Sequence, residues 1–142
     1  MEKTALLQLD WRKRAGGGGR TEREYLDFVV DGQPLSEKLG GDLASCLGWF
    51  VPAGNAKVVN QLLLKETAAL PNNRHCLYVC PECGELECGA ITAVIERRED
   101  EIIWRDFGFQ SNPDKITAIQ SFNDISFAFD RAQYYQAIKR EL

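Results

Sequence analysis

The sequence has no apolar run of about 18 residues, the length that a membrane-spanning helix needs. Its first residues include Glu2 and Lys3 and hold no apolar stretch typical of a secretory leader. It also lacks the G-x-x-x-x-G-K-[ST] loop that cradles phosphates and any G-x-G-x-x-G fingerprint between a strand and a helix. These absences predict no membrane span and neither of the common nucleotide sites.

Positive charge is in short supply. The 17 Lys and Arg residues are outnumbered by 21 Asp and Glu, which gives a net charge of −4 over 142 residues. Nucleic-acid binding draws on clustered cations that displace counterions from phosphates, so no nucleic-acid partner is expected. A basic partner would be attracted instead. With a hydrophobic share of 44%, the chain has enough material for one domain with one core.

Cysteine is present five times, an odd number, and the spacing is not that of a secreted disulfide framework. A reducing cytoplasm, with thiols free or bound to metal, is the expected location. Cys46 and Cys76 are interpreted as small core residues, because free cysteine buries readily.

The first part of the chain, residues 1–24, joins a basic cluster to four consecutive glycines at 16–19. Ordering a glycine run carries a large entropic cost, so we expect a flexible segment here. Residues 25–142 are expected to form a single α+β domain, in which an antiparallel β-meander packs against a few helices.

Hydrophobic patterns and turn residues place the elements of this domain. Strands are expected at 25–30, 77–80, 90–97 and 102–109. In the last of these, alternation puts Trp104 on the face of Ile102, and Ile103, Phe107 and Phe109 on the other face. A short helix is expected to begin at Pro34 and a second to be capped by Asn55. The second would carry an apolar stripe of Val58, Val59, Leu62 and Leu63.

A C-terminal helix has the clearest local signal. Asp130 is placed to cap it, and Gln133 to reach back to the cap. Phe129 and Tyr134 occupy the two positions of a hydrophobic staple, and Tyr134 and Ile138 mark the buried face.

The segment 80–88 is the most distinctive. Cys80-Pro81-Glu82-Cys83-Gly84 is a C-x-x-C-G turn, and Cys88 follows it. Structural zinc takes four sulfur or imidazole ligands, so Cys80, Cys83 and Cys88 could be three of them, with His75 or Cys76 as the fourth.

Two other interpretations of this turn stay open. In one, Cys80 and Cys83 are a redox pair, although the neighbouring Glu82, Glu85 and Glu87 would raise a thiol pKa and weaken the nucleophile. In the other, the turn is a hairpin with free thiols. His75 is more simply a residue at a strand edge than a catalytic base, because no orienting carboxylate or nucleophile is evident.

The stretch "LYVCPECGELECGAIT", with "IIWRDFGF" and "FAFDRAQYYQAI", resembles a family of small uncharacterised bacterial proteins. Its members carry a Y-x-C-P-E-C-G-D-x-x-C-G-A-x-T motif and a W-x-D-F motif, and some are labelled oxidoreductase. The resemblance covers roughly residues 25–142, and Glu85 stands where the motif commonly has Asp. It implies that Cys80, Cys83 and Cys88 belong together.

Two functions follow from these observations as expectations. The first is a non-catalytic partner-binding protein, in narrower form an immunity-type inhibitor of a basic bacterial toxin, with a Cys-rich hairpin that holds structural zinc. The alternative is a thiol-dependent oxidoreductase that uses Cys80 and Cys83.

Overall fold

The computed structural model describes residues 4–40, 43–48, 52–68, 70, 72–82, 89–110, 119–122 and 125–139. Within these residues the chain forms two antiparallel sheets and three helices. The strands are β1 (Leu7–Arg14), β2 (Arg23–Val30), β3 (Gln33–Pro34), β4 (Ala44–Ser45), β5 (Arg74–Val79), β6 (Ala90–Arg98), β7 (Glu101–Gln110), β8 (Ile119–Ser121) and β9 (Phe127–Asp130). The helices are α1 (Leu35–Leu39), α2 (Pro52–Leu62) and α3 (Arg131–Lys139). The expected α+β fold with a C-terminal helix is confirmed.

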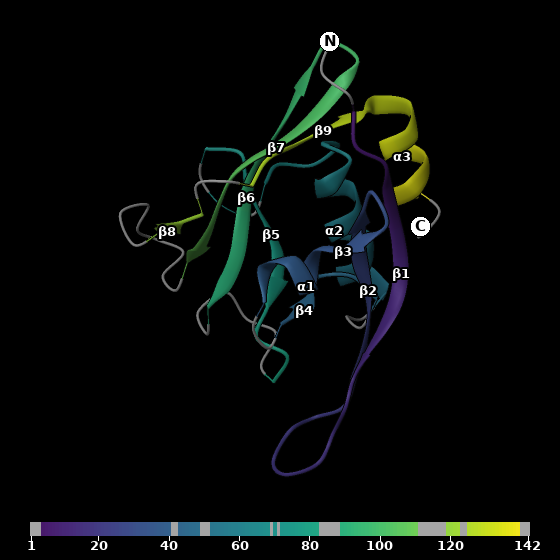
Figure 1. Ribbon diagram of the computed structural model, residues 1–142. Helices are drawn as coiled ribbons and strands as arrows, with labels where there is room; N and C mark the ends of the chain where they lie inside the picture. Colours follow the sequence, from purple (N-terminus) through teal and green to yellow (C-terminus); the bar gives the residue numbers. More distant parts are fainter. Residues whose placement is uncertain are drawn as a thin grey trace.

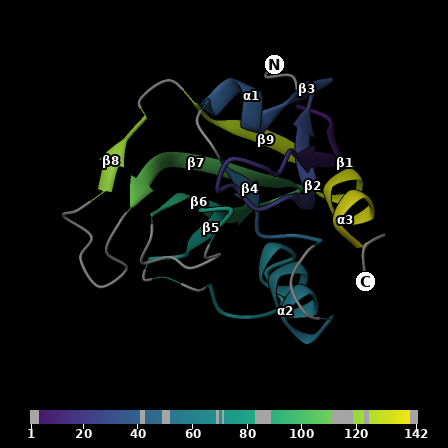
Figure 2. The same cartoon turned by 90° about the horizontal axis from the view of Figure 1, so that it is seen from below.

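The larger sheet has the order β4-β5-β6-β7-β8, with β9 also paired to β7, and the smaller sheet has the order β1-β2-β3 (Figure 1). The run β5-β6-β7 is the expected meander. Helices α1 and α2 lie on opposite sides of the strands, and α3 packs beside β1 (Figure 2). No helix in the described part of the chain has the length and apolarity required to cross a membrane.

The N-terminal segment differs from the expectation of a flexible stretch over residues 1–24. Leu7–Arg14 forms strand β1 and pairs along its whole length with β2. The glycine run makes the tip of this hairpin, where Gly17 and Arg20 exchange two backbone hydrogen bonds of 3.0 and 3.1 Å. Gly17, Gly18 and Gly19 all have positive φ, a conformation that costs glycine little. The glycines therefore serve as turn residues between two strands.

The alternation of inward-facing and outward-facing side chains in β7 is interrupted at Asp106. The pairing of β6 with β7 shifts between Thr92 and Val94, and Asp106, in the extra segment opposite, has a φ of 54°. A β-bulge of this kind reverses the alternation of side chains beyond it. Phe107 consequently turns into the core with Trp104, so the prediction that these two residues face opposite ways is wrong.

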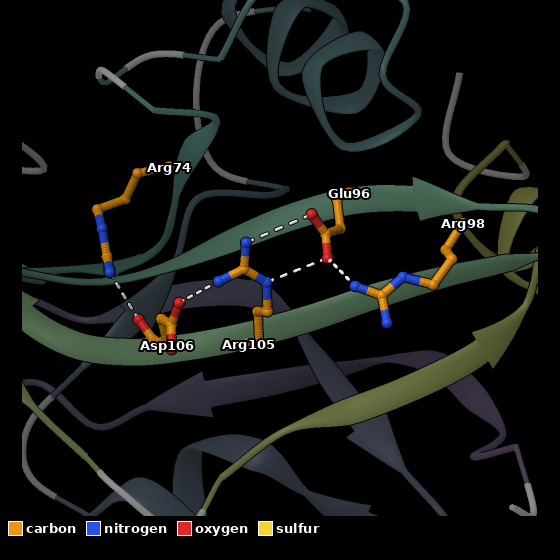
Figure 3. Close-up of polar contacts among 5 residues, drawn as sticks. All are labelled: Arg74, Glu96, Arg98, Arg105 and Asp106. Atoms are coloured by element: carbon orange, nitrogen blue, oxygen red, sulfur yellow. Dashed lines mark hydrogen bonds and ion pairs between the residues drawn. The ribbon is translucent and has the colours of Figure 1, made fainter.

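A polar network on the outer surface accompanies the bulge (Figure 3). Arg74 of β5 donates a hydrogen bond of 2.8 Å to the carbonyl oxygen of Asp106. Arg105 lies between the carboxylates of Asp106 and Glu96, and Arg98 also pairs with Glu96. The network thus ties β5, β6 and β7 together where the ladder is irregular.

The core between the two sheets is centred on Trp104, which is fully buried. Its ring meets Phe28 of β2 and Phe129 of β9 edge to face, at centroid distances of 5.3 and 5.1 Å. The indole N–H donates to the Tyr134 hydroxyl of α3 at 3.3 Å, and that hydroxyl donates to the Leu62 carbonyl at the end of α2 at 2.7 Å. One tryptophan therefore joins both sheets and two helices.

Helix α2 begins earlier than predicted, at Pro52, so Asn55 lies inside it rather than at its cap. The Asn55 side chain instead accepts a hydrogen bond of 2.9 Å from the backbone N–H of Gly48. The expected apolar stripe faces the core: Val59, Leu62 and Leu63 are buried, and Val58 packs against them.

Helix α3 begins as predicted. The Asp130 carboxylate accepts a hydrogen bond of 3.0 Å from the backbone N–H of Gln133, the rings of Phe129 and Tyr134 lie 5.6 Å apart, and Ile138 is buried. The Gln133 side chain, however, does not return to Asp130. It donates to the carbonyl of Leu7 at 2.5 Å and accepts from the Leu7 N–H at 3.1 Å.

Candidate functional site

The described part of the cysteine-rich turn comprises Cys80–Glu82 after β5 and Gly89 before β6. Cys80 is half-buried and is a free thiol. Cys83 and Cys88 lie outside the described residues, so the predicted grouping of three sulfurs stays a prediction. Among the residues that are described, no group of three or more His, Cys, Asp or Glu side chains is arranged to hold a metal ion.

His75, proposed above as a fourth metal ligand, lies near the start of β5, whereas Cys80 follows its end. Strand residues advance by about 3.3 Å each, which separates the two by roughly 16 Å along the strand. Ligands of one zinc ion lie within about 2.3 Å of the metal, so this geometry does not bring His75 and Cys80 to one ion. Burial lowers the pKa of His75 to about 4, and the imidazole is neutral at pH 7.

The N-terminal hairpin holds the cysteine-rich turn through Glu82. One carboxylate oxygen accepts hydrogen bonds from Arg14 at 2.7 Å and from the backbone N–H of Thr21 at 2.9 Å. The other accepts from the Thr21 hydroxyl at 2.7 Å, and Arg23 donates to the Pro81 carbonyl at 2.7 Å. The two Thr21 bonds, followed by the Arg14 bond, lower the pKa of Glu82 to about 2.

The hydrogen bonds from Arg14 and Thr21 to Glu82, called here the Glu82 clamp, bear on the chemistry of the turn. The sequence-based case against a redox pair relied on uncompensated acidic neighbours, but the charge of Glu82 is balanced by Arg14, whose side chain is 6% exposed. Glu85 and Glu87 lie outside the described residues. Glu82 by itself therefore gives no reason to expect a weak nucleophile at this turn.

A second polar cluster lies inside the molecule and had no signal in the sequence. Asp27 of β2 is 1% exposed and accepts hydrogen bonds from the hydroxyls of Ser36 and Tyr78. Burial, followed by the charge of Asp27, raises the pKa of Tyr78. The Asp27 carboxylate accepts from two donors and is buried, so the cluster joins β2, α1 and β5, and its Ser36 also lines a groove.

Beside this cluster is a groove of about 330 Å³, lined by residues that include Arg12, Lys13, Arg14, Tyr25 and Ser36. Three of the cations that line it pair with carboxylates: Arg12 with Glu37 at 3.1 Å, Lys13 with Glu22 at 2.8 Å and Arg14 with Glu82 at 2.7 Å. The basic cluster of the sequence is therefore largely neutralised within the hairpin. This leaves the net negative charge of the chain to dominate at a distance.

The outer edge of β1 is the other prominent feature. The bond from the Asp31 N–H to the Leu6 carbonyl sets the register, so the even-numbered residues of β1 direct their backbone groups to β2. The odd-numbered residues direct theirs outward. The Gln133 side chain bonds to the outward N–H and C=O of Leu7. The next outward backbone groups along the edge belong to Leu9, Trp11 and Lys13.

Trp11 belongs to this edge strand, and 61% of its surface is exposed. Its ring lies against Gly48, where a Cβ atom would approach Trp11 Cζ3 to 3.0 Å, so the absence of a side chain at residue 48 makes room for the indole. Leu6, just before β1, is 47% exposed. An aromatic residue held in place and open to solvent is typical of a protein-binding surface.

Comparison with known proteins gives no family: no family model, no curated protein and no solved structure matches the chain significantly.

Sequence reasoning missed one pairing of reactive groups. Cys46, after β4, and Cys76, in β5, have their sulfur atoms 2.9 Å apart. Cys46 is buried as predicted, but Cys76 is only partly so. The chain separation of 30 residues carries no local signal, and the contact arises because β4 pairs with β5.

Proposed function

We propose that this protein is a non-catalytic partner-binding protein whose binding surface is the outer edge of β1. The exposed indole of Trp11, which extends from β1 over β2 and lies against Gly48, is the observation that carries the proposal.

The edge suits an extended segment of a partner. The outward backbone groups of Leu9, Trp11 and Lys13 offer the hydrogen bonds that an added strand would use. Trp11 would supply the anchor, since tryptophan is the residue most enriched among interface hot spots.

In its narrower form, the proposal is an immunity-type inhibitor of a basic bacterial toxin, such as a nuclease. The net charge of −4, together with the paired state of Arg12, Lys13 and Arg14, favours a cationic partner. Electrostatic steering would speed capture, and a strand laid across β1 would fix the register of the complex.

The test begins with gene order. We expect the gene to lie directly downstream of a toxin gene, and the two products to copurify and bind in calorimetry. Trp11→Ala should weaken binding by about 30-fold or more, the effect of losing a hot spot. Phe109→Ala, which removes a 37% exposed aromatic from the other sheet, is the control.

A matched pair of variants tests the use of the backbone. Lys13→Pro removes an outward N–H, and Lys13→Ala removes the same side chain while keeping that donor. Added-strand binding predicts that only the proline variant loses the hydrogen bond. Unrelated neighbouring genes and no copurifying product would rule out the immunity form, and equal binding by Trp11→Ala would rule out this surface.

Structural zinc at Cys80, Cys83 and Cys88 is the second part of the proposal, with the fourth ligand outside β5. Native mass spectrometry of protein purified without chelator reads the metal directly. If no zinc is retained and a thiol titrates well below its usual pKa of about 8.5 in alkylation experiments, the thiol oxidoreductase becomes the better assignment.

A further inference from the structure

The sulfur atoms of Cys46 and Cys76 lie 2.9 Å apart. A disulfide bond is about 2.05 Å long, so joining the pair needs a movement of the sulfurs of roughly 1 Å. The backbone already sets this approach, because Cys46 continues the pairing of β4 with β5 and donates its N–H to the Leu77 carbonyl at 3.1 Å.

The described surroundings of the pair are apolar and offer no metal site. The sulfurs lie in a small apolar cluster with Val58, Val79 and Ala90, and no third metal-ligating side chain joins them among the described residues. Among the described residues, the Cys76 sulfur also contacts the Tyr78 carbonyl oxygen at 3.7 Å.

We propose that Cys46 and Cys76 form a peroxide-sensitive redox site that closes to a reversible disulfide between β4 and β5. The site is separate from the cysteine-rich turn and from the binding edge of β1, and it does not rest on the proposed function.

The two cysteines have different environments, which assigns their order of reaction. Cys76 is partly exposed and meets the oxidant, whereas Cys46 is buried. The contact with Cys76 and then burial raise the pKa of Cys46, which keeps it a thiol until its neighbour has reacted.

The chemistry balances with hydrogen peroxide as the oxidant. The Cys76 sulfur attacks one peroxide oxygen, the O–O bond breaks, and the leaving hydroxide takes the thiol proton to give water and a sulfenic acid. The Cys46 sulfur then attacks the Cys76 sulfur, the S–O bond breaks, and the hydroxide leaves as water with the Cys46 proton. Two thiols and one peroxide thus give one disulfide and two waters, and a small thiol reverses the change by exchange.

Closing the pair would cross-link a loop that contains all of α2. A cross-link over a loop of this size restricts the unfolded chain and should raise the Tm by about 10 °C. Oxidation would therefore fasten the β4 edge of the larger sheet and the helix that follows it.

The experiment treats the purified full chain with hydrogen peroxide at low molar excess, blocks remaining thiols, and maps peptides without reduction. We expect a linked peptide pair containing Cys46 and Cys76, with the Tm rise reversed by dithiothreitol. Cys76→Ala should abolish both changes, and Cys80→Ser should keep both, because it leaves the pair intact.

The mapping requires no variant, so a failure of Cys76→Ala to fold would not obscure the result. Recovery of Cys46 as a blocked thiol while Cys76 is oxidised to sulfinic acid would overturn the proposal. A linked peptide without a dithiothreitol-reversible Tm rise would overturn the claim that the bond fastens β4 to β5.

Discussion

The guanidinium of Arg14, at the end of β1, donates a hydrogen bond of 2.7 Å to the carboxylate of Glu82, in the turn that follows β5. Sixty-eight positions separate the two residues in the chain. The contact holds the glycine-tipped hairpin against the cysteine-rich turn, so the two most unusual segments of the sequence support each other.

Loss of the Glu82 charge should loosen this contact. In the wild-type protein the backbone N–H of Thr21 donates to the Glu82 carboxylate. In Glu82→Gln this amide should exchange its hydrogen faster. Glu22→Gln, which removes a carboxylate from an exposed pair in the same hairpin, is the control. The pKa of Glu82 falls from 4.5 to about 2 on folding, so the stabilisation is complete above about pH 4.5 and lost as the pH falls through about 2. Unchanged Thr21 exchange in Glu82→Gln would contradict the clamp.

His75 should make the protein sensitive to a different pH range. Burial lowers its pKa from 6.5 to about 4, so between these values the unfolded chain binds more protons than the folded one. The free energy of unfolding should therefore decrease as the pH is lowered from about 6.5 to about 4, by about 3 kcal/mol in all. Urea denaturation at a series of pH values measures this. His75→Gln should flatten the slope in that range, and an identical slope in both proteins would refute the assignment.

Tyr134 and Tyr135 offer a matched comparison in α3. Tyr134→Phe removes the donor to the Leu62 carbonyl and the acceptor of the Trp104 indole in the buried core. The expected cost is about 1–3 kcal/mol of unfolding free energy, because both partners stay buried. Tyr135→Phe, whose hydroxyl makes no hydrogen bond to a described residue, should change stability by less than about 0.5 kcal/mol. Equal midpoints for the two variants in urea would show that the Tyr134 bonds contribute nothing net.

Features signalled by neighbouring residues could be read from the sequence, and those created by long-range pairing could not. The cap by Asp130 and the staple of Phe129 on Tyr134 depend on residues a turn apart, and both form as predicted. The bulge at Asp106 was missed because strict alternation assumes an uninterrupted ladder, and its effect on Phe107 appears only when β6 and β7 are paired.

The candidate site divides in the same way. The C-x-x-C-G turn is visible in the sequence, but its partner hairpin is not, since four glycines in a row are as typical of a tether as of a turn. The closeness of Cys46 and Cys76 depends on the pairing of β4 with β5, which no local pattern predicts. The exposure of Trp11 likewise follows from the position of β1 at the edge of its sheet.

The carboxamide of Gln133 forms hydrogen bonds with both the N–H and the C=O of Leu7, as a neighbouring strand would. The two residues are 126 positions apart in the chain. During synthesis on the ribosome, β1 emerges long before α3 exists. During this interval the outward N–H and C=O of Leu7 have no Gln133 to bond, and a holdase or the binding partner has access to them. Formation of α3 then occupies the backbone groups of Leu7 and leaves the outward groups of Leu9, Trp11 and Lys13 accessible to such proteins.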